Sequence, residues 1–255
     1  MSGWVSGRKK SAAPENLVIL DPRPGDAALE IIAKGARHLE KPGQQLDSVT
    51  CVLLAVKPQM FDALGGAIAQ IVPEDALVIS IMAGTTLATL RNVFPAQALI
   101  RAMPNTPAAI GAGITAFTSA EGVSKTQKTT ARRLLSAGGA VHEVETENLI
   151  DVVTAVSGSG PAYVFHMVEA LEAAAIVAGL PEDLAPDFAR QTIIGAGELL
   201  KKDPASATEL RQAVTSPNGT TQAALDVLMS ADGLPPLMRE TVGAALKRAK
   251  ELGQG

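Results

Sequence analysis

A chain of 255 residues, with 47% hydrophobic and 19% charged residues, can form one large or two modest folded domains, and it does not have the composition of a disordered protein. The formal net charge is −4 and no basic stripe occurs, so we expect no nucleic-acid partner. The single cysteine excludes an internal disulfide, and the three histidines are far apart, so we expect no metal site.

The N-terminal segment MSGWVSGRKKSAAP lacks the apolar core of a signal peptide, which predicts a cytoplasmic location. Residues 102–120 are uncharged, but prolines and glycines interrupt them, so we expect no membrane span. Cys51 lies in the apolar run TCVLLAV, where it is predicted to be a small buried hydrophobe rather than a reactive thiol.

From Leu17 to about Val144, apolar runs of strand length alternate with helical patterns. Strands that are apolar throughout are typical of a parallel sheet that helices cover on both faces. We therefore predict an α/β fold for residues 1–146, with a doubly wound, Rossmann-like parallel sheet. The predicted strands are LVILD (17–21), TCVLLAV (50–56), ALVISIM (76–82), ALIRAM (98–103), GITAFT (113–118) and VHEVE (141–145).

From Glu147 onward the sequence is alanine-rich and helical, and strand-like runs disappear. This predicts a second, all-helical domain at 147–255, in which SGSGP (157–161) interrupts one long helical pattern. The alanine and valine stripes exceed what one small helical domain buries, so we expect a homodimer, or a higher homo-oligomer built from dimers.

Polar or turn-forming residues follow four of the predicted strands. Strand ends need turns for purely structural reasons, so one strand end of this kind is weak evidence for a ligand site. In a doubly wound sheet, however, the ligand crevice lies outside the carboxyl ends of the strands, and four tips in series predict a cofactor edge. The four tips are Asp21-Pro22-Arg23, Lys57-Pro58-Gln59, Ala83-Gly84-Thr85 and Pro104-Asn105-Thr106-Pro107.

Asp21 matches part of the dinucleotide-binding fingerprint, in which an acidic residue about 20 residues after a GxGxxG loop binds the ribose. That loop would then lie near or before residue 1, and only MSGWVSG is present there, which could be the end of the helix after the loop. We expect the sequence to begin after the first strand, the phosphate-binding turn and much of the first helix. A mis-assigned start codon is one explanation, which the genomic DNA upstream of Met1 would test.

The stretch VTSPNGTTQAAL (214–225) places several hydroxyl, amide and glycine residues before an apolar run. Such side chains cap helix starts by accepting hydrogen bonds from free backbone N–H groups. A helix start can also bind a small anion such as a carboxylate. The residues leave both interpretations open, a cap alone or an anion site.

Five segments, in order and at their separations, resemble pyrroline-5-carboxylate reductase over roughly residues 15–250. RAMPNTP and SPNGTT together are highly specific, whereas AVKP alone is not, and the absent glycine loop is a departure from the family. The segments are AVKPQ (55–59), SIMAGTT (80–86), RAMPNTPAAIGAG (101–113), AVSGSGPAYVF (155–165) and VTSPNGTTQAAL (214–225).

The resemblance implies reduction of Δ1-pyrroline-5-carboxylate to L-proline, in proline biosynthesis, by hydride from NADPH or NADH. It implies that Ser216, with the amides near Gly219 and Thr220, binds the substrate carboxylate, and that Thr221 is the catalytic hydroxyl nearest the ring nitrogen. The implied cofactor-binding residues are Asp21, Arg23, Ala55, Val56, Lys57, Pro58, Ala83, Gly84 and Asn105.

Asp21 favours a free ribose hydroxyl and hence NAD, whereas Arg23 favours the 2′-phosphate of NADP. Because the family usually accepts NADP, we expect NADPH, with NADH as the alternative. Two other functions stay open. The chain could be an impaired or inactive dimeric remnant that has lost its cofactor cradle, or another two-domain Rossmann dehydrogenase.

Overall fold

The computed structural model describes residues 12–43 and 46–253, which form two compact units. The sheet unit contains residues up to Ser159 together with those from Ala245 onward, and the helical unit runs from Gly160 to Ala244. The chain therefore leaves the sheet unit once and returns to it once. The segment MSGWVSG, proposed above as a helix end, lies outside the described residues.

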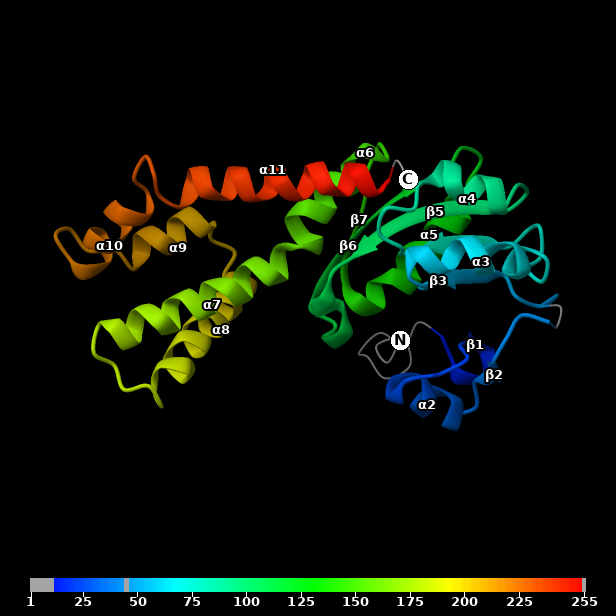
Figure 1. Ribbon diagram of the computed structural model, residues 1–255, viewed down its shortest axis with the longest axis horizontal. Helices are drawn as coiled ribbons and strands as arrows, with labels where there is room; N and C mark the ends of the chain where they lie inside the picture. The colour runs from blue at the N-terminus through cyan, green and yellow to red at the C-terminus, as the bar shows by residue number, and fades with distance from the viewer. Residues whose placement is uncertain (1–11, 44–45, 254–255) are drawn as a thin grey trace. The chain divides into compact units, whose positions relative to one another are not determined.

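The sheet unit holds a two-stranded and a five-stranded sheet (Figure 1). In the first, which follows the short turn η1 (Pro14–Asn16), β1 (Val18–Leu20) and β2 (Arg37–Leu39) pair in parallel and α2 (Asp26–Ala33) connects them. The five-stranded sheet has the order β3-β4-β5-β6-β7. Its strands are β3 (Cys51–Leu54), β4 (Leu77–Ser80), β5 (Ala98–Pro104), β6 (Gly113–Ser119) and β7 (Gly139–Glu143).

The α/β, doubly wound prediction is confirmed, but the expectation of an all-parallel sheet is wrong at one pair of strands. β6 runs antiparallel to β5, while the other neighbouring pairs are parallel. The connection explains the reversal, because only residues 105–112 separate the two strands, and they form η2 (Thr106–Ile110) and a left-handed Gly111 with φ of 73°. A parallel neighbour would require a crossover of about a dozen residues or more.

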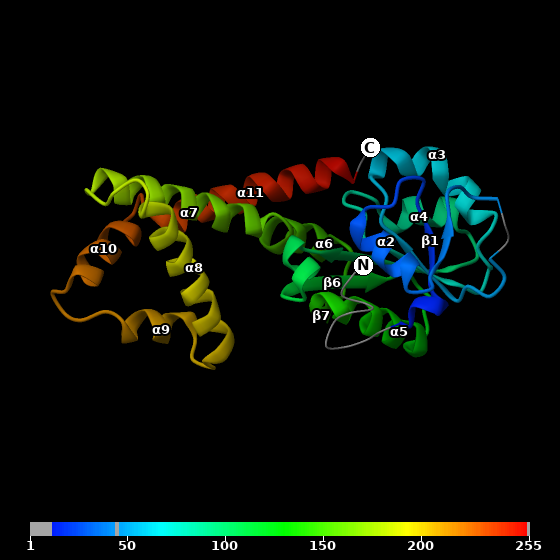
Figure 2. The same cartoon turned by 90° about the horizontal axis from the view of Figure 1, so that it is seen from below.

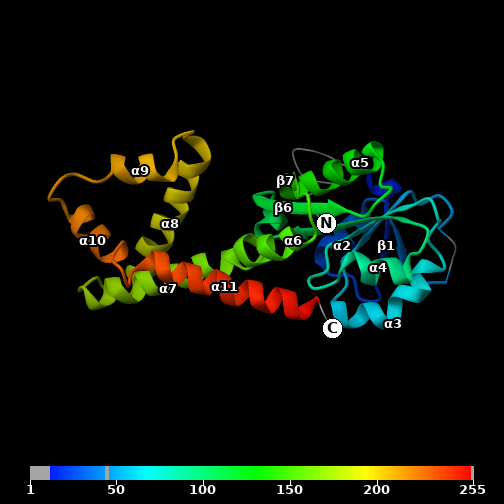
Figure 3. The same cartoon turned by 90° about the horizontal axis from the view of Figure 1, so that it is seen from above.

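Helices cover both faces of the five-stranded sheet, as Figures 2 and 3 show from opposite sides. On one face, α3 (Pro58–Ala69) and α4 (Leu87–Val93) bury Phe61 and Phe94 against the strands, and their rings stack with centroids 6.3 Å apart. On the other face, α5 (Lys125–Leu135), which the short η3 (Ser136–Gly138) follows, packs against Phe117. Each buried aromatic side chain contributes about 1.5–3 kcal/mol through its removal from water.

Cys51 begins β3 and is partly buried. Burial raises the pKa of its thiol to about 11, and the positive charge of Arg133 opposes this shift. The thiol therefore stays protonated near neutral pH, in agreement with the expectation of an unreactive cysteine.

All described elements after β7 are helical, as predicted. Within the sheet unit, α6 (Asn148–Val153) continues into the π-helical turn η4 (Thr154–Gly158), so the predicted interruption at SGSGP is a π-turn followed by a new helix. That helix is α7 (Gly160–Val177), and the others are α8 (Ala185–Lys202), α9 (Ala207–Ala213), α10 (Thr220–Leu228) and α11 (Leu234–Leu252). Within the described ranges, no helix is long and apolar enough to cross a bilayer.

Candidate active site

The cofactor-binding residues expected after three of the strands lie along one edge of the five-stranded sheet. β3, β4 and β5 are mutually parallel, so their carboxyl ends meet at the same edge. The side chains there are mostly small. Ala55 and Val56 follow β3, Ala83 and Gly84 follow β4, and Asn105 follows β5.

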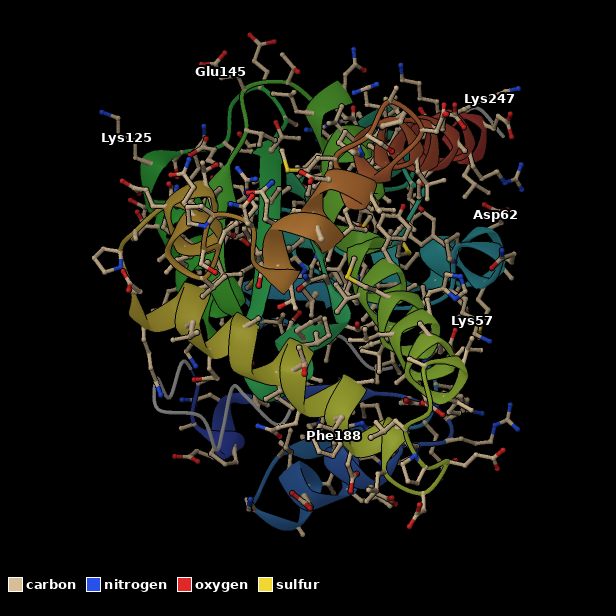
Figure 4. All side chains as sticks on the ribbon, turned by 90° about the vertical axis from the view of Figure 1, so that its left-hand side faces the viewer. Lys57, Asp62, Lys125, Glu145, Phe188 and Lys247 are labelled. Carbon is tan, nitrogen blue, oxygen red and sulfur yellow. The ribbon has the colours of Figure 1, made fainter. Side chains whose placement is uncertain are left out.

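The start of α3 offers hydrogen-bond donors and positive charge. Lys57 is its N-cap residue in an extended conformation, Pro58 is the first helical residue, and no side chain caps the helix. The first N–H groups therefore lack side-chain acceptors, and the exposed Lys57 adds a cation beside them (Figure 4). Free N–H groups, a helix dipole and a lysine fit a phosphate or ribose group of a dinucleotide.

The turn of residues 83–86, between β4 and α4, has a defined geometry. Gly84 has φ of +73°, and a Cβ atom there would come within 2.9 Å of the Leu252 carbonyl oxygen, so the position requires glycine. Thr86 ends the turn as the N-cap of α4, where its hydroxyl accepts a 3.1 Å hydrogen bond from the Thr89 N–H. The turn therefore presents mainly backbone to its surroundings.

Asn105 joins the end of β5 to the start of β6. Its side-chain Oδ1 accepts a 3.0 Å hydrogen bond from the Ile114 N–H. This contact fixes the orientation of the amide group. The amide nitrogen donates to no acceptor among the described residues, so it is available to a ligand at the strand edge.

Asp21 and Arg23 follow β1, and so they lie at the end of the two-stranded sheet rather than along the same strand series. The Oδ1 atom of Asp21 accepts a 2.9 Å hydrogen bond from the Arg23 N–H, which closes a local turn. The Asp21 carbonyl accepts a 2.8 Å hydrogen bond from His38 Nε2, so this nitrogen carries the imidazole proton. One carboxylate oxygen is thus already occupied, while the Arg23 side chain is exposed.

The expected substrate-binding residues lie in the helical unit, at the start of α10. The N-cap residue is Gly219, with φ of −83° and ψ of 171°, and no side chain caps the helix. The cap-only interpretation therefore does not describe this loop. Asn218 has φ of 59°, the only positive φ among the described non-glycine residues, and the Gly219 N–H donates to the Ser216 carbonyl at 3.0 Å.

Three hydroxyl groups of this loop, those of Ser216, Thr220 and Thr221, have no hydrogen-bond partner among the described residues. By contrast, the Thr215 hydroxyl donates to the Arg211 carbonyl at 2.6 Å and so belongs to α9. A hollow of about 390 Å³ lies between α9 and α10 and does not include the predicted substrate residues; its lining is Arg211, Gln212, Thr215, Gln222, Leu225, Asp226 and Met229. The free hydroxyls and the uncapped helix start form a cluster of unused donors.

A buried ion-pair network, which was not predicted from the sequence, lies around β5. Arg101 in β5, whose side chain is 2% exposed, contacts Glu147 at 3.0 Å and Asp151 at 2.8 Å. Its presence in the otherwise apolar run ALIRAM was the available signal, because a charge buried in a sheet must find partners. Among the described residues, no cluster of His, Cys, Asp or Glu could hold a metal ion.

Comparison with known proteins identifies the relatives of this chain. Residues 147–252 match the family model for pyrroline-5-carboxylate reductase dimerisation. The chain is 42% identical to pyrroline-5-carboxylate reductase of Synechocystis over 96% of this chain and 91% of that protein. It is 35% identical to the enzyme of that name from Pseudomonas aeruginosa, over 90% of this chain and 82% of the relative.

Solved structures agree with the sequence relatives. A pyrroline-5-carboxylate reductase from Coxiella burnetii superposes with a TM-score of 0.87 and 34% identity, over 98% of this chain and 92% of that chain. Plasmodium falciparum pyrroline carboxylate reductase with NADP bound superposes with a TM-score of 0.77 and 27% identity, over 94% of this chain and 88% of that one. From these similarities, the chain belongs to the pyrroline-5-carboxylate reductase family.

Proposed function

We propose that this chain reduces Δ1-pyrroline-5-carboxylate to L-proline with hydride from NADPH, with NADH as the alternative donor. The observation that carries the proposal is the start of α10, where an uncapped helix meets three unpartnered hydroxyl groups in a member of this family. Relatives named for the same activity at 34–42% identity favour it over another two-domain Rossmann dehydrogenase.

The substrate carboxylate would bind at this helix start. Ser216 and the backbone N–H groups near Gly219 and Thr220 would donate hydrogen bonds to it. The positive end of the helix dipole adds to the attraction for an anion. A side chain at position 219 would collide with the Ser216 hydroxyl, so glycine there keeps that hydroxyl free to reach a ligand.

Thr221 would donate or accept the hydrogen bond at the ring nitrogen. A protonated cyclic imine is already electrophilic, so the protein mainly needs to position it and to stabilise the nitrogen as the amine forms. The bound nicotinamide supplies the hydride. The Thr221 hydroxyl, like those of Ser216 and Thr220, lacks a partner at this helix start. One loop could therefore hold both the carboxylate and the nitrogen of one small ring.

The cofactor would lie along the strand edge formed by Ala55, Val56, Ala83, Gly84 and Asn105. Lys57 and the N–H groups that follow Pro58 would bind its anionic or ribose groups. Because one Asp21 oxygen is held by the Arg23 N–H, Arg23 is the better candidate for contact with a 2′-phosphate, which favours NADPH. The relative from Plasmodium falciparum binds NADP, which supports this choice.

The matched dimerisation model supports homo-oligomerisation of this chain. We propose a homodimer, or a larger oligomer built from dimers. We also propose that the functional division of the chain falls between residues 1–146 and 147–255, since the matched model begins at residue 147.

The decisive experiment incubates the purified chain with synthetic Δ1-pyrroline-5-carboxylate and NADPH and follows both NADPH absorbance and L-proline formation. We expect NADPH loss that depends on the imine, matched by an equal amount of L-proline. A dimer of normal thermal stability that produces no L-proline with either cofactor would contradict the proposal and would support the inactive remnant.

A further inference from the structure

Two segments connect the sheet unit to the helical unit. Within the sheet unit, one of them contacts the turn of residues 83–86 and the other contacts Leu87, directly after it. The outgoing segment is α6 with η4, and the returning segment is the end of α11. The turn of residues 83–86 is where the cofactor residues Ala83 and Gly84 are expected. The returning segment therefore contacts Gly84 itself, and the outgoing segment contacts Leu87, the residue that follows the turn.

The first contact comes from Glu147, at the start of α6. Its Oε1 atom accepts a 2.8 Å hydrogen bond from the N–H of Leu87, the first residue of α4 after the turn. The same oxygen accepts a 3.0 Å hydrogen bond from Arg101. A single carboxylate oxygen thus joins β5, the start of α6 and the start of α4, directly after the turn.

Arg101 holds this carboxylate in place. Its guanidinium is buried and also contacts Asp151, one turn further along α6, at 2.8 Å. Exposed ion pairs are mobile and weak, but a buried guanidinium with two carboxylate partners has few alternative geometries. Since its Nε atom has no partner among the described residues, the network depends on these two contacts.

The second contact comes from the end of α11. A Cβ atom at Gly84 would lie 2.9 Å from the Leu252 carbonyl oxygen and 3.0 Å from its Cβ, so Leu252 lies directly on the turn. A Cβ atom at Gly253 would lie 3.6 Å from Thr86 Cγ2, so the contact extends along the turn. In Figure 1 the red end of α11 reaches the loops of the sheet unit.

We propose that Glu147, held by Arg101, and Leu252 are positioning residues that fix the 83–86 turn in the conformation that receives the cofactor. None of the three is expected to touch the cofactor. Their effect would be on cofactor affinity, because the turn presents backbone groups whose positions follow the two contacts. The inference rests on the proposed function, since the cofactor role of Ala83 and Gly84 is itself a proposal.

The test compares Glu147→Ala, Glu147→Gln and Leu252→Gly with Glu143→Gln. Glu143 is the matched control, because it forms an ion pair with Lys128 away from the turn. Loss of a hydrogen bond to a charged group should weaken NADPH binding about tenfold in Glu147→Ala, and raise KM for NADPH accordingly, with kcat changed less than about threefold. Glu147→Gln keeps an acceptor oxygen and should stay within about threefold of wild type. Leu252→Gly removes the Cβ atom that lies against Gly84 and should lie between the two Glu147 variants.

A second readout does not depend on any cofactor. Hydrogen exchange of the Leu87 amide should accelerate in Glu147→Ala and stay unchanged in Glu143→Gln. Lower thermal stability of Glu147→Ala, with Leu87 exchange and NADPH affinity equal to those of the control, would overturn the inference. Wild-type reduction of the imine would be unaffected by that result, so the proposed function stands or falls separately.

Discussion

The two units of this protein use similar apolar side chains in opposite ways. In the sheet unit, Phe94 and Phe117 are 0% exposed, whereas in the helical unit Phe165 and Phe188 are 62% and 60% exposed. The buried residues described in the helical unit are Ala185 and Ala189. The sheet unit completes its own core, and the helical unit does not.

The difference follows from the layers that each unit can form. A sheet with helices on both faces buries two apolar surfaces within one chain. The helical unit packs α7 against α8, but the large apolar side chains of its helices remain uncovered. An exposed apolar surface of this kind indicates a partner, and in this family the partner is a second copy.

Introducing a charge into the helical unit should have the largest effect. Phe188→Asp, on α8 (Figure 4), would place an unpaired carboxylate on the exposed apolar surface that we expect a second copy to cover. That change costs about 3–5 kcal/mol, so association should weaken more than about 100-fold. Light scattering at micromolar concentration should show monomers. Leu29→Asp, at a 50% exposed position of α2 in the sheet unit, is the control and should leave the mass unchanged.

Removing a buried side chain from the core of the sheet unit should lower stability and leave the oligomeric mass unchanged. Phe94→Ala removes a fully buried ring from the stack with Phe61 and should lower the free energy of unfolding by about 3–5 kcal/mol. Denaturant titration measures this loss. The folded variant should keep the oligomeric mass of wild type, and a monomer would show that the two units are not independent.

Substitution of Thr221 tests the site on α10. If its hydroxyl stabilises the nitrogen in the transition state, Thr221→Ala should lower kcat roughly 10- to 150-fold, or about 1.5–3 kcal/mol, and raise KM less. Ser216→Ala should mainly raise KM, because the carboxylate is bound in ground and transition states alike. Steady-state kinetics with melting curves would expose a purely structural role, in which stability falls by about 1 kcal/mol and turnover is unchanged.

The smallest effect concerns two capping boxes, one in each unit. Ser124 with Gln127 caps α5, and Ser206 with Glu209 caps α9. Hydrogen bonds from Ser206 hold the pKa of Glu209 below its usual value. The α9 cap should therefore be intact at neutral pH and weaken as the pH falls through that pKa, whereas the α5 cap should not titrate. Amide chemical shifts of Gln127 and Glu209 across an acid titration would distinguish the two, and parallel shifts would refute the difference.

The sequence predicted most strands of the sheet and which residues follow them, because turn-forming residues mark where each apolar run ends. It missed β2, since Arg37, His38 and Leu39 show no strand alternation and pair only because β1 lies beside them. It also missed the direction of β6, because an apolar run has the same pattern in either direction. Direction depends on the length of the connection to β5.

The contacts around the 83–86 turn could not be predicted from the sequence. Glu147 and Leu87 are 60 residues apart, and Arg101 and Asp151 are 50 apart, so only the folded chain brings them together. The loop before α10 was partly predictable from the sequence. Its composition indicated either a cap or a ligand site, and the backbone had to show that Gly219, which has no side chain to offer, occupies the N-cap position.

The small buried content of the helical unit has a consequence for the kinetics of folding. A unit that buries Ala185 and Ala189 alone gains little free energy before it meets a second copy. Refolding should then contain a phase whose rate increases with protein concentration, after a first phase in which the sheet unit forms at a rate that concentration does not change. Dilution, rather than heat, would be the gentlest way to unfold the helical half of the molecule.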